Sequence, residues 1–267
     1  MNAMSSLPKN QTTGIAFSTA EDVFVRGKSL TKELIGRLTF TEMIVFQILG
    51  RMPSPGETRV IDACLVALME HGLTPSALAT RLVYSSATEA MQAAVAAGLL
   101  AVGSRFVGTT DDCGQLLERM LAAGGDLDDQ ARVIAREHQG GQRAVPGFGH
   151  PLHKPDDPRA RRLLEIARDE GVAGAHVAAV LALSRAIDEV YGKHITLNVT
   201  GAIAALLGDC GVPREILRGF SIIARAAGLV GHVHEEQRKP AMRAIWETAD
   251  QAIPYDGVLP GGGHPKK

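Results

Sequence analysis

The stretch AVPGFGHPLHKPDDPRAR, residues 144–161, concentrates glycine, proline and titratable side chains in one short segment of the chain. His150 lies between a glycine and a proline, and Lys154 follows soon after it. A loop of this composition can simply separate two helices at the surface. It can also direct several backbone N–H groups and one imidazole toward an anionic ligand. The residues of this segment alone leave both interpretations open.

The composition is that of a globular protein rich in small aliphatic side chains. The chain has 267 residues, of which 45% are hydrophobic and 21% are charged. Aromatic residues make up only 4%, which favours closely packed helices over a sheet sandwich. The formal net charge of -1 does not suggest a polyanionic partner. We therefore predict an all-α protein that does not bind nucleic acid.

Cysteine usage and hydropathy indicate the compartment. Cys64, Cys113 and Cys210 are far apart and lack the spacing of metal ligands, so we expect reduced thiols in a cytoplasmic protein. The N-terminus lacks the apolar segment of a secretory signal. The most apolar window, residues 91–104, is too short to cross a bilayer and is predicted to be a buried, tightly packed helix. We expect no membrane association, no metal and no redox cofactor.

Helix start signals recur along the chain and predict roughly ten helices. In three places a capping residue stands directly before a proline: Ser54-Pro55, Thr74-Pro75 and Asp157-Pro158. The first of these helices has an apolar stripe at helical spacing: Ile61, Cys64, Leu65, Leu68 and Met69. Only residues 195–199 alternate with the period of a strand, and no hairpin signal is apparent.

One arginine stands alone in a long apolar stretch. Between residues 220 and 233 the only ionisable side chains are Arg225 and His232, which are seven residues apart and therefore share a helix face. An arginine in apolar surroundings is costly unless an anion meets it. That anion could be a carboxylate of the protein or of a ligand, and the stretch itself favours neither. Gly228 and Gly231 would let another helix approach closely.

The helix after residue 157 begins with an unusual run of positive charge. Asp157 is predicted to cap it, and Arg159, Arg161 and Arg162 lie in its first turn. These arginines repel one another and oppose the helix dipole, whose positive end lies there. A bound anion or plain solvation would each resolve the conflict.

Four segments, in this order and spacing, resemble the citrate synthase superfamily. They are RGKSLTKELIGRLTFTEMIVFQILGRMPSP (26–55), MEHG (69–72), PGFGHPLHKPDDPRA (146–160) and ARAAGLVGHVHEEQ (224–237). The resemblance implies an all-α homodimer with a large helical domain and a smaller inserted helical domain. We place the large domain at residues 1–110, the small domain at 111–205, and the return segment with the C-terminal tail at 206–267.

Within the superfamily the sequence looks most like the citryl-CoA lyase type, the module that ends ATP-citrate lyase. In VGSRFVGTTDD (102–112), Phe106 stands where citrate synthases carry a catalytic histidine, and the lyase module is similar. ITLNVTGAIAALLGDCG (195–211) resembles the lyase's LILNVDG segment, except that Thr200 replaces the family's catalytic aspartate. This likeness also makes residues 195–199 the opening of a helix rather than a strand.

The resemblance implies a retro-Claisen cleavage of citryl-CoA, or of a related 3-hydroxy-carboxyacyl-CoA, to acetyl-CoA and oxaloacetate. The implied catalytic positions are His150, facing the hydroxyl or carbonyl oxygen, with Thr200 and Phe106. The implied carboxylate pocket comprises His71, Arg159, Arg225 and Asn198. The implied coenzyme A contacts are the backbone of Pro146, Gly147, Phe148 and Gly149, together with Lys154.

Two alternatives remain beside this hypothesis. Condensation of acetyl-CoA with a 2-oxo acid, as in citrate synthase, is one. A non-catalytic module that binds coenzyme A or a dicarboxylate is the other, because Thr200 cannot act as a carboxylate. In each case the expected partners are a small acyl-CoA and an oxo-dicarboxylate.

Overall fold

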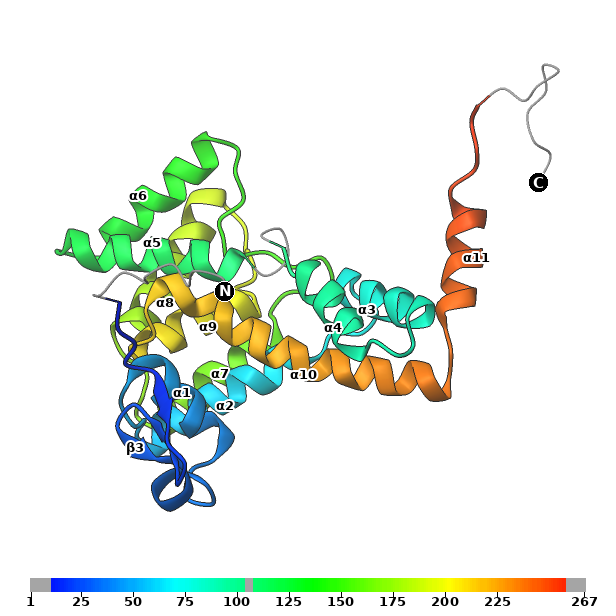
Figure 1. Ribbon diagram of the computed structural model, residues 1–267. Helices are drawn as coiled ribbons and strands as arrows, with labels where there is room; N and C mark the ends of the chain where they lie inside the picture. The colour runs from blue at the N-terminus through cyan, green and yellow to red at the C-terminus, as the bar shows by residue number, and fades with distance from the viewer. Residues whose placement is uncertain (1–10, 104–107, 258–267) are drawn as a thin grey trace.

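The computed structural model describes residues 11–103 and 108–257, and helices dominate it (Figure 1). This confirms the predicted all-α class. The helices within these residues are α1 (Phe40–Leu49), α2 (Pro55–Met69), α3 (Pro75–Ser86), α4 (Met91–Leu100), α5 (Thr109–Ala123), α6 (Leu127–Gly140), α7 (Pro158–Asp169), α8 (Ala175–Tyr191), α9 (Val199–Asp209), α10 (Leu217–Arg238) and α11 (Met242–Ala252). A π-helical turn (Leu30–Leu34) and a 3-10 turn (Arg214–Ile216) complete them.

The three helices start where predicted, but Thr74 does not cap α3, since its Oγ1 atom is buried and makes no hydrogen bond. The Ser54 hydroxyl accepts a hydrogen bond from the N–H of Glu57, whose carboxylate accepts one from the N–H of Ser54, so α2 opens with a capping box. Asp157 caps α7 by accepting from the N–H of Arg159. Asn198 caps α9 in the same way. Helix α9 therefore begins at Val199, and the strand-like residues before it make a single bridge, between Leu197 and Phe148.

A small antiparallel sheet near the N-terminus was not predicted. It has the order β1 (Ala16–Ser18), β2 (Val23–Val25), β3 (Lys28–Ser29). Arg26 and Gly27 join β2 to β3 with φ angles of 46° and 79°, the positive values that a tight two-residue hairpin turn requires. The expectation of no hairpin was wrong because strands of two or three residues are too short to show a period. The turn also opens with arginine rather than asparagine or aspartate.

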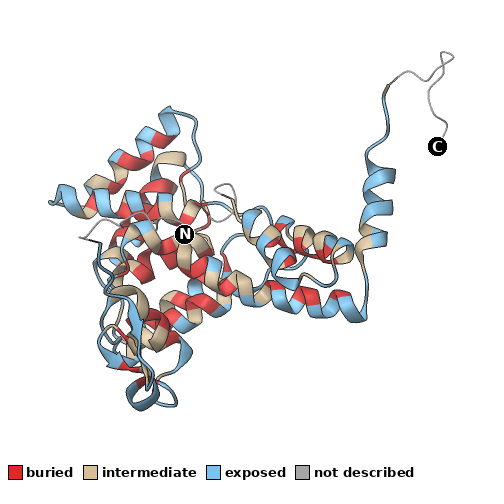
Figure 2. Ribbon diagram, in the orientation of Figure 1, coloured by how far each residue is buried: buried red, intermediate tan, exposed pale blue. Residues whose placement is uncertain are grey.

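The helices form a main body and an arm (Figure 1). The body surrounds one continuous cluster of buried apolar side chains, to which α1, α2 and α5 through α10 contribute (Figure 2). Helices α3 and α4 pack on each other and on the C-terminal half of α10, and so extend away from the body. Helix α11 stands at the far end of the arm and has no buried residue. The domain boundaries proposed from the sequence stay a prediction.

Helix α10 connects the body to the arm. A Cβ at Gly228 would collide with the carbonyl oxygen of Met69, so glycine is what lets the end of α2 lie directly against α10. The same expectation for Gly231 was wrong, since a Cβ there would meet open space. The segment Arg214–Arg238 is long and apolar enough to cross a membrane, but it packs on α2, α3 and α4 as core helices do.

The expectation that residues 91–104 form a fully buried helix was wrong in part. Helix α4 is present, but only Ala94 and Gly98 are buried, and Leu100 is 86% exposed. The helix is apolar apart from Gln92, and it packs on α3 and α10 through Ala94, Gly98 and the partly buried Val95. The apolar composition predicted a helix correctly, whereas it did not predict how much of that helix the chain itself covers.

Candidate active site

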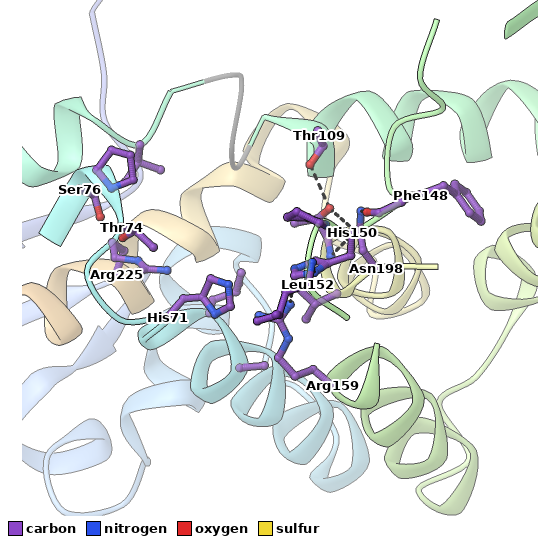
Figure 3. A pocket seen from close by; sticks show the side chains of 18 of the residues that line it. His71, Thr74, Ser76, Thr109, Phe148, His150, Leu152, Arg159, Asn198 and Arg225 are labelled. Carbon is purple, nitrogen blue, oxygen red and sulfur yellow. Dashed lines mark hydrogen bonds between the residues drawn. The ribbon is translucent and has the colours of Figure 1, made fainter. Parts of the chain in front are cut away.

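A cavity of about 520 Å³ lies where the arm meets the body (Figure 3). Several parts of the chain converge on it: the end of α2 with the start of α3, the residues that follow α4, the middle of α10, the loop at residues 148–152 with the start of α7, and the N-termini of α5 and α9. Among the described residues, the lining contains four basic side chains and no carboxylate. The basic residues are His71, His150, Arg159 and Arg225. Such a cavity attracts an anion.

The loop conformation fixes which nitrogen of His150 carries the proton. Gly149 has a φ of +83°, and its N–H donates to the carbonyl of Thr196 at 2.7 Å, which turns the chain inward before His150. The Nδ1 atom of His150 accepts hydrogen bonds from the N–H groups of Leu152 (3.1 Å) and His153 (2.9 Å). A neutral imidazole whose Nδ1 accepts has its proton on Nε2. His150 therefore presents an N–H donor from Nε2.

Arg159 adds a second donor at the same place. Its guanidinium is held by buried Asp157, with Nε–Oδ1 and Nη2–Oδ2 distances of 3.0 and 2.8 Å. Its Nη2 atom also lies 3.4 Å from Nε2 of His150. Because both nitrogens carry hydrogens, they do not satisfy each other, and the pair suits an oxygen acceptor shared between them.

Arg225 faces the cavity from α10 and has no hydrogen-bond or ion-pair partner among the described residues. Its Nη1 atom is buried and makes no hydrogen bond. Burial lowers the pKa of this guanidinium below its usual value, and the charge of Glu70 opposes the shift only in part. The sequence left open whether Arg225 meets a carboxylate of the protein or of a ligand. Among the described residues, no protein carboxylate forms an ion pair with it. The unpaired guanidinium is the arrangement a carboxylate ligand would complete.

Glu70, whose charge acts on Arg225, directs both of its oxygens to other partners. One oxygen accepts from the N–H groups of His71 (2.8 Å) and Gly72 (2.6 Å). The other lies 3.0 Å from Nε2 of His232. His232 in turn accepts from buried Arg81 through Nδ1 at 3.1 Å, and Arg81 is also paired with Glu235 and Glu236. This network holds the turn that carries His71 and leaves Arg225 available.

The imidazoles of the cavity lie in positive surroundings. The rings of His150 and His153 stack with centroids 4.4 Å apart, and the His71 centroid is 6.1 Å from that of His150. Burial, followed by the charges of His153 and Arg159, lowers the pKa of His150. Burial, followed by the charge of Arg159, likewise lowers the pKa of His71. Both rings are therefore biased toward the neutral form in the free protein.

A family model described as "Citrate synthase, C-terminal domain" matches residues 15–246. The chain belongs to the citrate synthase family. A solved structure of citryl-CoA lyase from Hydrogenobacter thermophilus is 33% identical, with a TM-score of 0.85, and the match covers 94% of this chain and 96% of that one. The likeness to the citryl-CoA lyase type that the sequence suggested is thereby confirmed.

Curated relatives are longer proteins. ATP-citrate synthase beta chain protein 1 of Arabidopsis thaliana is 29% identical over 213 residues, which are 71% of this chain and 33% of the plant protein. The citrate synthase of Synechocystis is 23% identical over 204 residues, 75% of this chain and 50% of that protein. This member of the citrate synthase family thus spans between a third and a half of these relatives. An ATP citrate lyase from Methanothrix soehngenii, solved with citrate and coenzyme A, shares the fold at 21% identity and a TM-score of 0.76.

The cavity brings together residues that the sequence placed in three different roles: catalysis, carboxylate binding and coenzyme A binding. Those that line it are His71, Phe148, Gly149, His150, Arg159, Asn198, Thr200 and Arg225. Pro146, Gly147 and Lys154 are not in the lining. Gly147 instead has a packing role, because a Cβ there would collide with Cys113 and Gly201. Phe106 lies outside the described residues. Within the described part of the chain, no group of three or more His, Cys, Asp or Glu residues is arranged to hold a metal ion.

Sequence reasoning missed several residues of the site. Thr109 lines the cavity and contacts Thr200, and Glu70 holds the backbone of His71. His153 stacks on His150 and was given no role from the sequence. The quoted motifs contain Glu70 and His153, so their positions beside His71 and His150 were an available signal. Thr109 lies in the quoted segment at residues 102–112, three residues after Phe106, so its position was an available signal as well.

Proposed function

We propose that this chain is a carbon–carbon lyase that cleaves citryl-CoA, or a related 3-hydroxy-carboxyacyl-CoA, to acetyl-CoA and oxaloacetate. The observation that carries the proposal is the shared cavity, in which the Nε2–H of His150 and the unpaired guanidinium of Arg225 face the same space. The 33% identity to citryl-CoA lyase over nearly the full length supports the choice of reaction within the family.

The residues present suggest how such a substrate would be held. Arg225, together with His71, would bind one carboxylate, and the paired donors of His150 and Arg159 would bind an oxygen nearer the reacting carbon. An N–H from His150 would stabilise the alkoxide that forms when the hydroxyl group loses its proton. When the C–C bond breaks, that oxygen becomes a carbonyl oxygen and the negative charge passes to the thioester enolate, whose carbon then takes up a proton to give acetyl-CoA. The hydroxyl proton still has to leave. Since no carboxylate lines the described cavity, we expect the unmodified chain to turn over slowly.

Coenzyme A is proposed to bind along the loop at residues 146–154. Phe148 and Gly149 line the first cavity and also a second one of about 390 Å³, to which Gln142 and Arg143 contribute. A thioester that extends from one cavity to the other would pass this loop and meet Arg143, a cation suited to a phosphate. Lys154 is exposed and is kept as a proposed phosphate contact.

The test is to incubate the protein with citryl-CoA, citramalyl-CoA and malyl-CoA and to follow the products by mass spectrometry. We expect acetyl-CoA and oxaloacetate from citryl-CoA. If the main reaction is the release of pyruvate from citramalyl-CoA, the protein is still a lyase but its substrate is citramalyl-CoA. Citrate formed from acetyl-CoA and oxaloacetate would instead favour the synthase. Binding of all three thioesters without any product would favour the non-catalytic module, which is the alternative that Thr200 permits.

We also propose that the protein is a homodimer, as the resemblance implies. Helix α11 supports this, since none of its residues is buried and Trp246 is 67% exposed in the single chain. Sedimentation equilibrium is expected to give about twice the chain mass of 28.3 kDa. A mass equal to that of one chain would contradict it. A cytoplasmic location stays a proposal as well.

Binding of citrate is expected to take up protons and to tighten as pH falls. In the free protein the pKa values of His71 and His150 are lowered by burial and by the cations around them. An anion bound among these groups favours the charged imidazole of His71 and raises its pKa, so the complex holds more protons than the free protein. His150 is expected to stay neutral, because its Nδ1 already accepts two backbone N–H groups. Calorimetry at pH 6.5 in two buffers of different ionisation enthalpy, corrected for the ionisation of citrate, measures the uptake. Zero uptake, or affinity that rises with pH, would contradict this expectation.

A further inference from the structure

Three polar side chains form a hydrogen-bonded chain at the edge of the cavity where the family's aspartate is replaced (Figure 3). The Oγ1 atoms of Thr109 and Thr200 are 3.0 Å apart, and Thr200 Oγ1 lies 2.7 Å from Oδ1 of Asn198. All three residues line the cavity. The chain crosses from the start of α5 to the start of α9, so it connects two elements that are distant in sequence.

The orientation of the Asn198 amide is fixed by its other contacts. Its Oδ1 accepts from the N–H groups of Thr200 (3.0 Å) and Gly201 (3.2 Å), while its Nδ2 donates to the carbonyl of Gly149 (3.0 Å). Exchanging the oxygen and the nitrogen of the amide would break all three bonds. The atom that faces the Thr200 hydroxyl is therefore an oxygen, which can only accept.

The direction of the whole chain follows from that oxygen. Thr200 has one hydroxyl hydrogen and donates it to Asn198. The hydrogen between the two threonines must then come from Thr109, which donates to Thr200. Both hydroxyl hydrogens are thus used inside the protein, and only oxygen lone pairs remain for a ligand. This edge of the cavity accepts hydrogen bonds and donates none from these two side chains.

We infer that Thr109 and Thr200 form a specificity edge that recognises a hydroxyl group on the ligand and discriminates against analogues that lack it. A hydroxyl can donate to this edge and accept from the Nε2–H of His150, which lies on the same side of the cavity (Figure 3). A ketone or a methylene group offers no donor. A site built to bond a hydroxyl group rejects the analogue without it, because the polar atoms of the site then lose their partner.

This inference deepens the proposed function, on which it rests for the class of ligand, namely a 3-hydroxy polycarboxylic acid. It assigns the recognition of the ligand's hydroxyl group to Thr109 and to Thr200, which stands where the family has an aspartate. Thr109 is a specificity residue here and is given no part in proton transfer.

The experiment compares the binding of citrate with that of tricarballylate, which is citrate without its hydroxyl group, by isothermal titration calorimetry. The unmodified protein is expected to prefer citrate by about ten-fold, the value of one hydrogen bond. The double variant Thr109→Val/Thr200→Val removes the lone pairs while keeping the side-chain shape, and it is expected to lose most of the preference, since only the Nε2–H of His150 is then left to bond the hydroxyl oxygen. The double variant Thr109→Ser/Thr200→Ser keeps both hydroxyl groups and is expected to keep the preference. Near-UV circular dichroism of all three proteins shows whether the fold is retained.

The outcomes separate this inference from the proposed reaction. Equal binding of the two acids by the unmodified protein overturns the inference, as does a preference that is undiminished in the valine variant or failure of both acids to bind. A citrate preference that depends on the two hydroxyl groups, in a protein that yields no products from citryl-CoA, retains the inference and removes the proposed lyase activity. Cleavage of citryl-CoA by a protein that binds citrate and tricarballylate equally retains the proposed lyase activity and removes the inference about the hydroxyl group.

Discussion

Replacing Thr200 by aspartate is expected to raise the rate of citryl-CoA cleavage by about 10²–10⁴-fold, the contribution of one general acid or base. The reason is the composition of the cavity, whose described lining offers imidazoles and guanidinium groups but no carboxylate to take the hydroxyl proton. The imidazole of His150 has its proton on Nε2 and so begins as a donor. Thr200→Asp supplies the acceptor that is missing.

The local structure accommodates this substitution. Thr200 is the second residue of α9, where the positive end of the helix dipole stabilises a carboxylate. The side chain at this position is only partly buried, so an ionised group keeps some contact with water. The rate is measured as acetyl-CoA release under saturating substrate. Thr200→Asn is the matched control, since it has the same shape without a charge.

Two results would contradict the role given to this position. Equal rates for Thr200→Asp and Thr200→Asn would show that the charge at residue 200 does not limit the reaction. A rapid reaction by the unmodified protein, with no gain from the aspartate, would show that another group takes the proton. In that case the Nε2–H assignment of His150 would be the first to re-examine, by measuring the ring nitrogen shifts in NMR.

Local signals in the sequence predicted where helices begin better than they predicted which residues of those helices are buried. A capping residue followed by proline depends only on neighbouring atoms, and the starts of α2, α3 and α7 were therefore correct. Burial depends on partners distant in the sequence. The apolar composition of α4 did not reveal that Leu100 is left exposed, and Gly231 resembles Gly228 in sequence but faces open space.

The site shows the same limit. The sequence marked His150 and Arg225 as unusual, each by its own surroundings, but 75 residues separate them and nothing local says that they share a cavity. The direction of the hydrogen bonds from Thr109 to Asn198 was beyond any pattern, because it follows from the orientation of one amide. The likeness to a family supplied the missing proximity. The likeness could not show how the chain functions with Thr200 in place of the family's aspartate.

Replacing Arg225 by methionine is expected to weaken citrate binding by about 10²-fold while leaving the free energy of unfolding unchanged or raising it by about 1 kcal/mol. The loss of citrate affinity without a loss of stability follows from the state of the guanidinium in the free protein. Its Nη1 atom is buried without a hydrogen-bond partner, and burial has lowered its pKa. A flexible apolar side chain of similar length removes that cost and also removes the only group on α10 that faces the ligand.

Arg81 provides the matched control, because it is a buried arginine of the same region that has the ion pairs and hydrogen bonds which Arg225 lacks. It is paired with Glu236, which is only 3% exposed, and with Glu235, and it donates to His232. Arg81→Met leaves the carboxylate of Glu236 buried without its partner and is expected to lower the free energy of unfolding by about 3–5 kcal/mol. Urea denaturation and citrate titration of both variants give the comparison. If Arg225→Met loses stability as Arg81→Met does and still binds citrate with unchanged affinity, Arg225 is a structural residue, and the cavity must bind its anion through His71, His150 and Arg159 alone.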